Sequence, residues 1–221
     1  MCGRYVVNTT KEILKKKFKV KDVPDMKLQR FNIAPTQNIP VVRFVEGERE
    51  ISLLHWGLIP SWAKDEQLAA KMINARSETV TEKPSYKKAF QQRRCLIPAS
   101  GFYEWKKTRE GKEPFYFYMK DNGLLAFAGL WDSWRNPDNE LIESCTILTT
   151  EANDVLKPVH DRMPVILNES DYDLWLDADV RKQDLRLELL NPFSAQEMKS
   201  HSVSTLVNSP KNDDVSCIAP L

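Results

Sequence analysis

The second residue of this chain is a cysteine, and its place after the initiator methionine opens a chemistry that internal cysteines lack. The sequence begins Met1-Cys2-Gly3-Arg4. Cysteine is small enough for Met1 to be removed, which would leave Cys2 with a free α-amine next to its thiol. Such an amine has a pKa of roughly 7.7–8.0, so a useful fraction is neutral near neutral pH and can form a Schiff base with an aldehyde. The thiol can then close a five-membered thiazolidine ring. The alternative is a cysteine that follows Met1 by chance.

Two titratable residues, Glu104 and His160, are candidates for the proton transfers that this chemistry needs. Glu104 lies between Tyr103 and Trp105. On a half-buried strand it would face solvent, whereas apolar surroundings would raise its pKa and make it a proton donor near neutral pH. His160 is one of three histidines. It is either a loop residue with satisfied hydrogen bonds or an acid–base group, because its reference pKa is near 6.5.

Two tryptophans and two arginines are candidates for nucleic-acid contacts. Trp56 and Trp62 stand on either side of a proline turn, where they are either core residues or platforms for base stacking. Arg76 and Arg162 are either members of surface ion pairs or bidentate phosphate ligands. The formal net charge is +1 and argues neither for nor against nucleic acid. DNA binding would require basic residues that gather in a local groove.

The cysteine spacing and the hydropathy pattern exclude several other classes of protein. The four cysteines lie far apart with no C-x-x-C pair, so no zinc site is predicted. No cofactor is predicted either, because an aldehyde trap needs only an amine, a thiol and a proton shuttle. Cys95 and Cys145 lie in apolar runs and are predicted to be core residues. No stretch approaches the roughly 18 apolar residues of a membrane span, and no signal peptide is apparent. We expect reduced thiols and a cytoplasmic protein.

The elements that must position these residues point to an α+β fold. No linker or repeat divides the 221 residues, and we expect one domain over residues 1–221. Residues 9–20 are predicted to form a helix, with Thr9-x-x-Glu12 as a capping box. Residues 85–94 are also predicted to be helical, and helices are predicted to start within 151–156 and 171–175. Strands are predicted over 39–45, 51–55, 95–97, 101–106, 115–119, 124–130 and 145–150. Because strands and helices do not alternate regularly, we predict a bent, mainly antiparallel sheet, similar to an open barrel, flanked by helices.

The ordered set of short motifs resembles the SRAP family (SOS response-associated peptidase) over nearly the whole chain. Each motif alone is weak, but the order is specific. The motifs are Met1-Cys2-Gly3-Arg4-Tyr5, Asn32-x-Ala34-Pro35, Trp56-Gly57-Leu58, Asn74-Ala75-Arg76-x-Glu78-Thr79, Arg94-Cys95-Leu96-Ile97-Pro98, Gly101-Phe102-Tyr103-Glu104-Trp105, Ala128-Gly129-Leu130-Trp131, Thr149-Thr150, His160-Asp161-Arg162-Met163-Pro164 and Val207-Asn208-Ser209. The family includes bacterial proteins, among which we expect this chain, and the eukaryotic shield proteins of abasic sites.

This resemblance implies covalent capture of abasic sites in single-stranded DNA, which shields the lesion from strand cleavage. It implies that Cys2 is the nucleophile and crosslinking residue, and that Asn74 holds its amine and the ring-opened sugar. Glu104 and His160 are implied to move protons, and His160 also to reverse the crosslink. Further residues are implied to line the DNA path, as phosphate contacts (Arg4, Asn32, Arg76 and Arg162) or as neighbours of the strand (Pro40 and Trp62). The family fold is a single α+β domain whose sheet curves around a positively charged groove.

Three other functions remain open from the sequence. The first is a cysteine peptidase in which His160 activates Cys2, although the only peptide cleavage that we credit is removal of Met1, autocatalytic or assisted. The second is a non-covalent single-strand binder in which Cys2 is incidental. The third is an interaction protein, in which Asn74, Glu104 and His160 would not converge on Cys2. With capture as the function, we expect a monomer that binds no membrane and no metal and associates with the nucleoid on damaged DNA.

Overall fold

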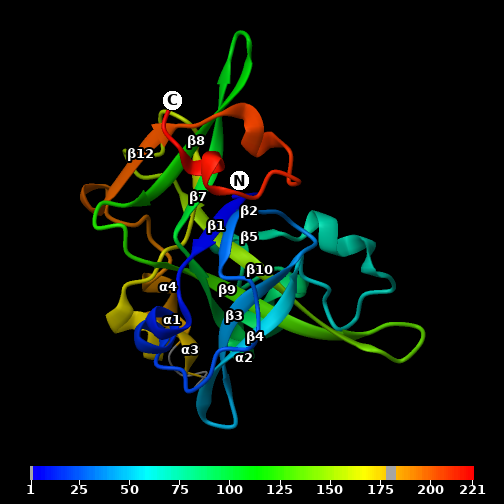
Figure 1. The fold of residues 1–221 in the computed structure, drawn as a ribbon. Helices are drawn as coiled ribbons and strands as arrows, with labels where there is room; N and C mark the ends of the chain where they lie inside the picture. Colours follow the sequence, from blue (N-terminus) through cyan, green and yellow to red (C-terminus); the bar gives the residue numbers. More distant parts are fainter. Residues whose placement is uncertain (1, 178–182) are drawn as a thin grey trace.

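The computed structural model describes residues 2–177 and 183–221, and its strands form two sheets (Figure 1). The first sheet is antiparallel throughout, in the order β12-β8-β7-β1-β2. Its central pair is a hairpin in which Glu104 is the register partner of Phe115. The strands of this sheet are β1 (Tyr5–Asn8), β2 (Gln29–Ile33), β7 (Gly101–Thr108), β8 (Gly111–Met119) and β12 (Met198–Ser202).

The second sheet closes on itself. Its order is β11-β10-β4-β3-β6-β9, and β9 also pairs with β10, so that five strands form a closed barrel. Most pairs are antiparallel, but β10 runs parallel to β4 and β5. The strands of this sheet are β3 (Asn38–Val45), β4 (Glu48–Trp56), β5 (Asn74–Arg76), β6 (Arg94–Ala99), β9 (Leu125–Arg135), β10 (Leu141–Glu151) and β11 (Arg162–Pro164).

Helices cover the outside of the sheets. They are α1 (Lys11–Phe18), α2 (Pro84–Gln92), α3 (Tyr172–Leu176) and α4 (Gln183–Glu188). In Figure 1, α1 and α3 lie in the same corner of the molecule, where the rings of Phe18 and Tyr172 stack with centroids 5.6 Å apart. Among the described residues, no helix is both long and apolar enough to cross a membrane.

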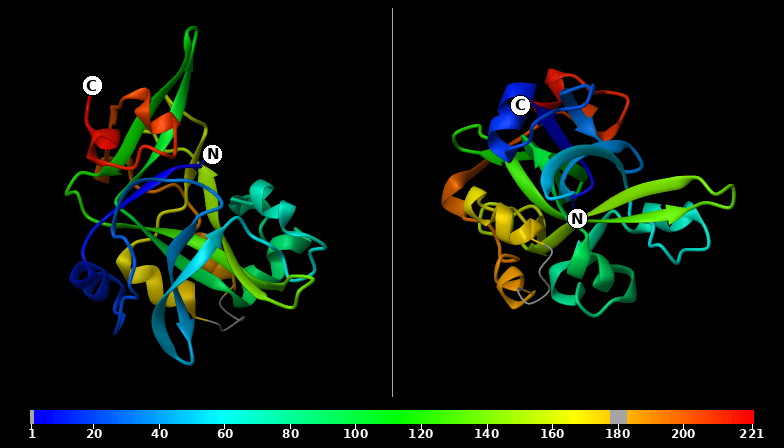
Figure 2. Two further views of the ribbon diagram at one scale, coloured as in Figure 1. Left: turned by 45° about the vertical axis from the view of Figure 1, so that its right-hand side comes forward. Right: turned by 90° about the horizontal axis from the view of Figure 1, so that it is seen from below.

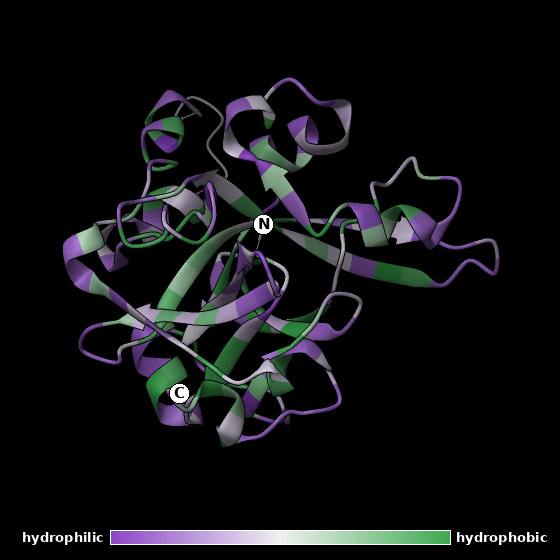
Figure 3. Cartoon of the chain, turned by 90° about the horizontal axis from the view of Figure 1, so that it is seen from above, coloured by the Kyte–Doolittle hydropathy of each residue, from purple (hydrophilic) through white to green (hydrophobic). Residues whose placement is uncertain are grey.

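One apolar core runs through the barrel and onto the first sheet. Tyr5 of β1 packs edge-on against the buried ring of Trp56, with centroids 5.4 Å apart, and Phe102 of β7 packs against Phe127 of β9. Apolar residues concentrate along the central strands and polar residues in the outer loops (Figure 3). Cys95 and Cys145 are fully buried free thiols, as predicted.

The predicted α+β class and the bent, mainly antiparallel sheet are confirmed, although the strands divide into two sheets and one of these closes. The helix predicted over 9–20 is α1, but its N-cap is Thr10, whose hydroxyl accepts from the Ile13 amide, and not Thr9. The helix start predicted within 151–156 is wrong. There the Asn153 side chain accepts from the Leu156 amide and forms a turn, a local bond that competes with a helix.

The C-terminal end of β9 and the N-terminal end of β10 pair with each other and extend beyond the barrel as a two-stranded arm (Figure 2). The loop that carries Trp62 packs beside this arm. The Trp134 indole donates to the Ala63 carbonyl at 2.7 Å, and the Ser61 amide donates to Asp132 at 3.0 Å. The arm therefore holds Trp62 at the surface, where it is 58% exposed.

Candidate active site

The four predicted catalytic residues come from four separate segments that meet where the two sheets adjoin. Cys2 precedes β1, Asn74 begins β5, Glu104 lies on β7, and His160 lies between β10 and β11. Asn74 contacts Cys2 directly, the Glu104 carboxylate acts electrostatically on the Cys2 thiol, and Glu104 and His160 line one cavity. These side chains lie close to one another, which disfavours the alternative of an interaction protein, in which they would lie apart.

Asn74 anchors the backbone of Cys2. Its Nδ2 donates to the Cys2 carbonyl at 2.8 Å, and its own carbonyl accepts from the Tyr86 hydroxyl at 3.3 Å. Parallel pairing with Ile147 of β10 fixes the position of Asn74 on the barrel. Its Oδ1 is buried and has no hydrogen-bond partner among the described residues. Since an unpaired buried acceptor is costly, this oxygen is suited to accept a bond from a ligand.

Glu104 is a buried carboxyl, 2% exposed, so the solvent-facing alternative is wrong. Burial raises its pKa, because a carboxylate loses its hydration there, and the nearby His160 charge opposes part of this rise. A carboxyl with a raised pKa keeps its proton to a higher pH than an exposed glutamate does, which makes Glu104 a candidate proton donor.

The thiol of Cys2 is fully buried. Burial, and secondly the Glu104 carboxylate, raise its pKa well above the ordinary value, while the backbone of Arg4 lowers it slightly. The thiol therefore stays protonated in this environment. A reactive thiolate is found where cations and exposure lower the pKa, which is the opposite arrangement.

His160 is held by its own loop. Its Nδ1 accepts from the Arg162 amide at 3.0 Å, which leaves the proton of the neutral ring on Nε2. The Asp161 carboxylate lies 3.0 Å from the same Nδ1, a contact that is favourable only when the ring is protonated at that nitrogen. Because Asp161 is 87% exposed and its attraction is weakened by water, we take the amide bond as the contact that orients the ring.

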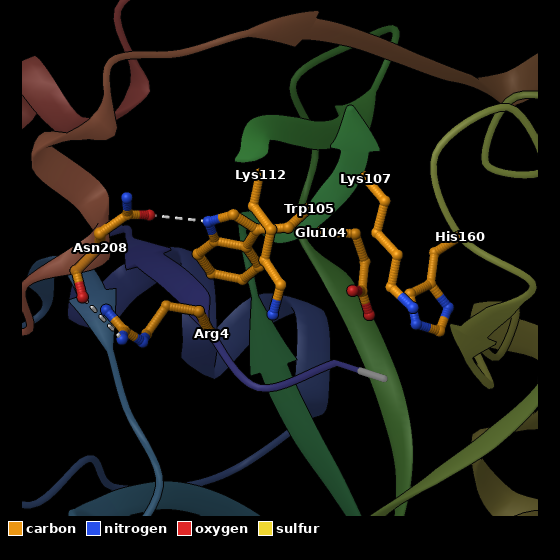
Figure 4. A pocket seen from close by; sticks show the side chains of 7 residues that line it. All are labelled: Arg4, Glu104, Trp105, Lys107, Lys112, His160 and Asn208. Carbon is orange, nitrogen blue, oxygen red and sulfur yellow. Dashed lines mark hydrogen bonds between the residues drawn. The ribbon is translucent and has the colours of Figure 1, made fainter. Parts of the chain in front are cut away.

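A cavity of about 430 Å³ opens beside Glu104 and His160. In Figure 4 the Glu104 carboxylate points toward the N-terminal end of the chain, with His160 and Lys107 on one side of it and Trp105 on the other. The complete lining consists of Arg4, Glu104, Trp105, Lys107, Lys112, His160 and Asn208. Of these residues, Asn208 belongs to the Val207-Asn208-Ser209 motif, whereas Lys107 and Lys112 lie outside every motif of the sequence. The only signal for the lysines was their position on either side of the turn between β7 and β8.

Arg4 is fixed by oxygen atoms that carry no full charge. Its Nη1 donates to Asn32 Oδ1 at 2.7 Å and to the Val207 carbonyl at 2.8 Å, and its guanidinium lies 5.9 Å from the ring centroid of Trp105. Asn208 completes this group, since its carbonyl accepts from Arg4 and its side chain accepts from the Trp105 indole. Partial burial lowers the pKa of Arg4. Arg4 thus presents a positive charge to the cavity.

The other residues predicted to lie along the DNA divide into exposed and buried ones. Arg76 is exposed and makes no ion pair with any residue of the described chain. Arg162 donates two bonds to Glu78 and one to the Thr149 carbonyl. Asn32 is fully buried, and its Nδ2 bonds three carbonyls of the C-terminal segment 207–212. Pro40 is buried within β3. In this conformation Asn32 holds Arg4 and the C-terminal segment in place, and the contacts of Asn32 and Pro40 with DNA stay predictions.

The described residues offer no group of three or more His, Cys, Asp or Glu side chains placed to bind a metal ion.

Comparisons with known proteins identify the family. The model of the SOS response associated peptidase (SRAP) family matches residues 1–210. The abasic site processing protein YoqW of Bacillus subtilis (strain 168) is 41% identical over 216 residues, which covers 96% of each chain. The abasic site processing protein HMCES of Xenopus tropicalis is 34% identical over 86% of this chain and 66% of that protein.

Solved structures agree with the fold. A crystal structure of a protein from Bordetella bronchiseptica has a TM-score of 0.79 and 30% identity, and the match covers 92% of this chain and all of that chain. A crystal structure of a protein from Bacteroides thetaiotaomicron has a TM-score of 0.86 over all of both chains, and at 24% identity it bears on the fold alone. From the family match and these relatives, we conclude that this chain belongs to the SRAP family.

Proposed function

We propose that this protein captures abasic sites in single-stranded DNA through Cys2 and shields the lesion during the response to DNA damage. Its relatives in Bacillus subtilis and Xenopus tropicalis are named abasic site processing proteins. The observation that carries the proposal is the arrangement around Cys2. Asn74 bonds the Cys2 carbonyl at 2.8 Å, and Glu104, a buried carboxyl with a raised pKa, acts electrostatically on the Cys2 thiol and shares a cavity with His160.

In the proposed reaction the ring-opened sugar presents its C1′ aldehyde to the α-amine of Cys2. The nitrogen adds to the carbonyl carbon, and the resulting hydroxyl leaves as water once a proton is delivered to it, which gives the imine. The sulfur then adds to the imine carbon, and the thiol proton ends on the nitrogen, so that ring closure needs no external proton. One water is lost overall. Protonated Glu104 is the donor for the leaving hydroxyl, and His160 exchanges protons during ring opening and reversal. This Schiff-base chemistry, similar to that of lyases, requires no cofactor.

The state of the Cys2 thiol favours this order of steps over peptidase chemistry. A thiolate–imidazole nucleophile needs a lowered thiol pKa, whereas burial raises that of Cys2. An amine that attacks first has no such need, because the thiol reacts only at ring closure. We therefore propose peptide cleavage only for the loss of Met1, which lies outside the described residues, by the protein itself or with assistance.

The proposed strand runs over exposed basic residues near the site. Arg76 supplies an exposed guanidinium on β5 that forms no ion pair within the described part of the chain, and Arg162 becomes available if a phosphate displaces Glu78. Trp62, held at the surface by the arm, is positioned for stacking on a base. We propose a monomer that acts in the cytoplasm and at the nucleoid, on short single-stranded stretches, where a strong overall positive charge is unnecessary.

The test is a denaturing gel after incubation with a single-stranded oligonucleotide that carries one abasic site. Wild type should give a heat-stable adduct and Cys2→Ala none, whereas Cys95→Ala, which removes an equally buried thiol from the barrel, should crosslink as wild type does. Cys2→Ser should give only an imine that borohydride traps. A non-covalent binder would instead retain abasic DNA equally well with alanine at residue 2, and that result would sink the proposal.

A further inference from the structure

The hairpin of β7 and β8 places two lysines directly opposite each other. Lys107 is the register partner of Lys112, next to the pair formed by Lys106 and Glu113. Like charges directly opposite across a strand pair are destabilising, whereas opposite charges are favourable. The hairpin therefore combines one favourable charge pair with one that opposes its own folding.

Neither lysine of the unfavourable pair is neutralised by the protein. Within the described chain, no carboxylate lies within ion-pair distance of Lys107, Lys112 or Arg4. All three line the cavity of about 430 Å³, and the carboxyl in its lining is Glu104. One carboxyl therefore faces three cations in this lining. The cavity is thus a concave surface with an excess of positive charge.

This basic group is distinct from the one formed by Arg76 and Arg162. Those arginines belong to β5 and β11 of the barrel sheet, whereas Lys107 and Lys112 belong to the first sheet. Glu104 and His160 line the cavity, and His160 bonds the backbone of Arg162. The catalytic residues consequently adjoin one basic group on each sheet.

We propose that the cavity is an anion subsite in which Lys107 and Lys112, together with Arg4, bind a phosphodiester group of the DNA strand next to the lesion. The identity of the ligand rests on the proposed function. A phosphate in the cavity would offset the repulsion between the two lysines by accepting charge-assisted hydrogen bonds from their amines, and so reduce the cost that the hairpin carries when the cavity is empty. The strand would then cross the catalytic residues from the barrel sheet to the first sheet. The contrasting possibility is that both lysines are only a solvated face of the hairpin.

Lys106 is a matched control for this distinction. It has the same charge, lies on the same strand next to Lys107, is exposed, and is opposite Glu113 instead of in the cavity lining. Replacing Lys106 or Lys107 by glutamine changes the net charge by the same amount. A difference in DNA binding between the two variants therefore reports a local binding site.

The experiment measures binding of an undamaged single-stranded oligonucleotide by fluorescence anisotropy at several salt concentrations. A substitution that removes one lysine–phosphate interaction should lower the slope of log K against log salt by roughly 0.7. Lys107→Gln and Lys112→Gln should each show this decrease, the double variant about twice as much, and Lys106→Gln almost none. The melting temperatures of Lys107→Gln and Lys112→Gln without DNA should equal or exceed that of wild type, because the repulsion is relieved. Slopes equal to that of Lys106→Gln would overturn the proposal.

This result is independent of covalent capture, since an undamaged strand offers no aldehyde. Reduced slopes for both cavity variants would support the subsite even if wild type formed no adduct with abasic DNA. An adduct in wild type together with unchanged slopes would overturn the subsite and leave the proposed function intact.

Discussion

Two glutamates near the catalytic residues occupy opposite electrostatic environments. Glu78 is half exposed, and its hydrogen bonds from Arg162 lower its pKa below the usual range. Glu104 also borders cations, but burial dominates and raises its pKa. One carboxyl therefore stays charged and the other is able to carry a proton. Carboxyl groups whose environments separate their pKa values in this way divide the roles of charge and acid between them. For Glu104, the effect of burial on the pKa of the carboxyl is larger than the effect of the nearby cations.

The largest expected effect separates the two carboxyls by function. Glu104→Gln removes the proton donor while keeping the shape, so the single-turnover rate of crosslinking should fall about 100-fold or more. Glu78→Gln should change that rate little. Gel time courses with abasic single-stranded DNA measure both, and anisotropy with undamaged DNA should show that Glu104→Gln still binds. Equal rates in wild type and Glu104→Gln would remove Glu104 from the mechanism.

The pH dependence of crosslinking should sharpen the same contrast. The protonated form of Glu104 is the active donor, and its fraction falls about tenfold per pH unit above the pKa. The wild-type rate should therefore follow a bell-shaped pH profile, since it needs a neutral amine and a protonated Glu104 at the same time, and it should decline at high pH, where Glu104 has lost its proton. In Glu104→Gln the declining limb should be absent. A profile of the same shape in both proteins would assign the declining limb to another group.

A smaller effect is expected from the anchor of Cys2. Asn74→Ala removes the 2.8 Å bond to the Cys2 carbonyl, a bond worth about 1 kcal/mol, so crosslinking should slow about fivefold to tenfold. Tyr86→Phe removes only the hydroxyl that donates to the Asn74 backbone and should have less effect. The measurement is again the single-turnover rate. If Tyr86→Phe slowed the reaction as much as Asn74→Ala, general loosening of β5 would explain both results.

If Arg76 on the barrel sheet contacts a phosphate, its removal should change the salt dependence of DNA binding and leave the crosslinking chemistry unchanged. Arg76→Ala should weaken binding regardless of sequence and lower the salt slope by roughly 0.7. Arg135→Ala is the control, because Arg135 lies near the far end of the β9–β10 arm, where it bonds the Asn139 carbonyl. An unchanged slope in Arg76→Ala would place Arg76 outside the DNA path.

The smallest effect concerns the ion pair itself. Glu78→Gln breaks the charge pair with Arg162 at a partly exposed site, so the free energy of unfolding should change by less than about 1 kcal/mol. The released Arg162 should bind undamaged DNA slightly more tightly than wild type does. Denaturant titration and anisotropy measure the two effects. Weaker binding in this variant would mean that Glu78 orients Arg162 toward the strand and does not compete with it.

Local patterns in the sequence predicted much of the fold. The β-branched and aromatic runs gave strands such as β3 and β9, because their side chains fit a pleated and buried surface. The closure of the barrel was not predictable in this way, since it depends on long-range pairs such as that of β10 with β4. The capping-box pattern predicted Thr9 as the cap of α1, whereas the folded backbone uses the next residue, Thr10.

The candidate site shows the same division between local and long-range information. Motif order drew attention to Glu104 and His160, but a single carboxyl in an aromatic strand was compatible with either exposure or burial. The buried position of Asn32 depends on the C-terminal segment, which is distant in sequence. Lys107 and Lys112 lie opposite each other because of the register of the hairpin. The folded turn sets this register, so the sequence pattern alone does not predict the pairing.

The most direct test of covalent capture is peptide mapping of the purified adduct by mass spectrometry. Capture at the amine and thiol of Cys2 predicts that the DNA remnant is attached to residue 2, that Met1 is absent, and that the adduct mass is the sum of both partners less one water. An adduct on any other residue, such as Lys107 beside the cavity, or on a chain that retains Met1, would contradict the account.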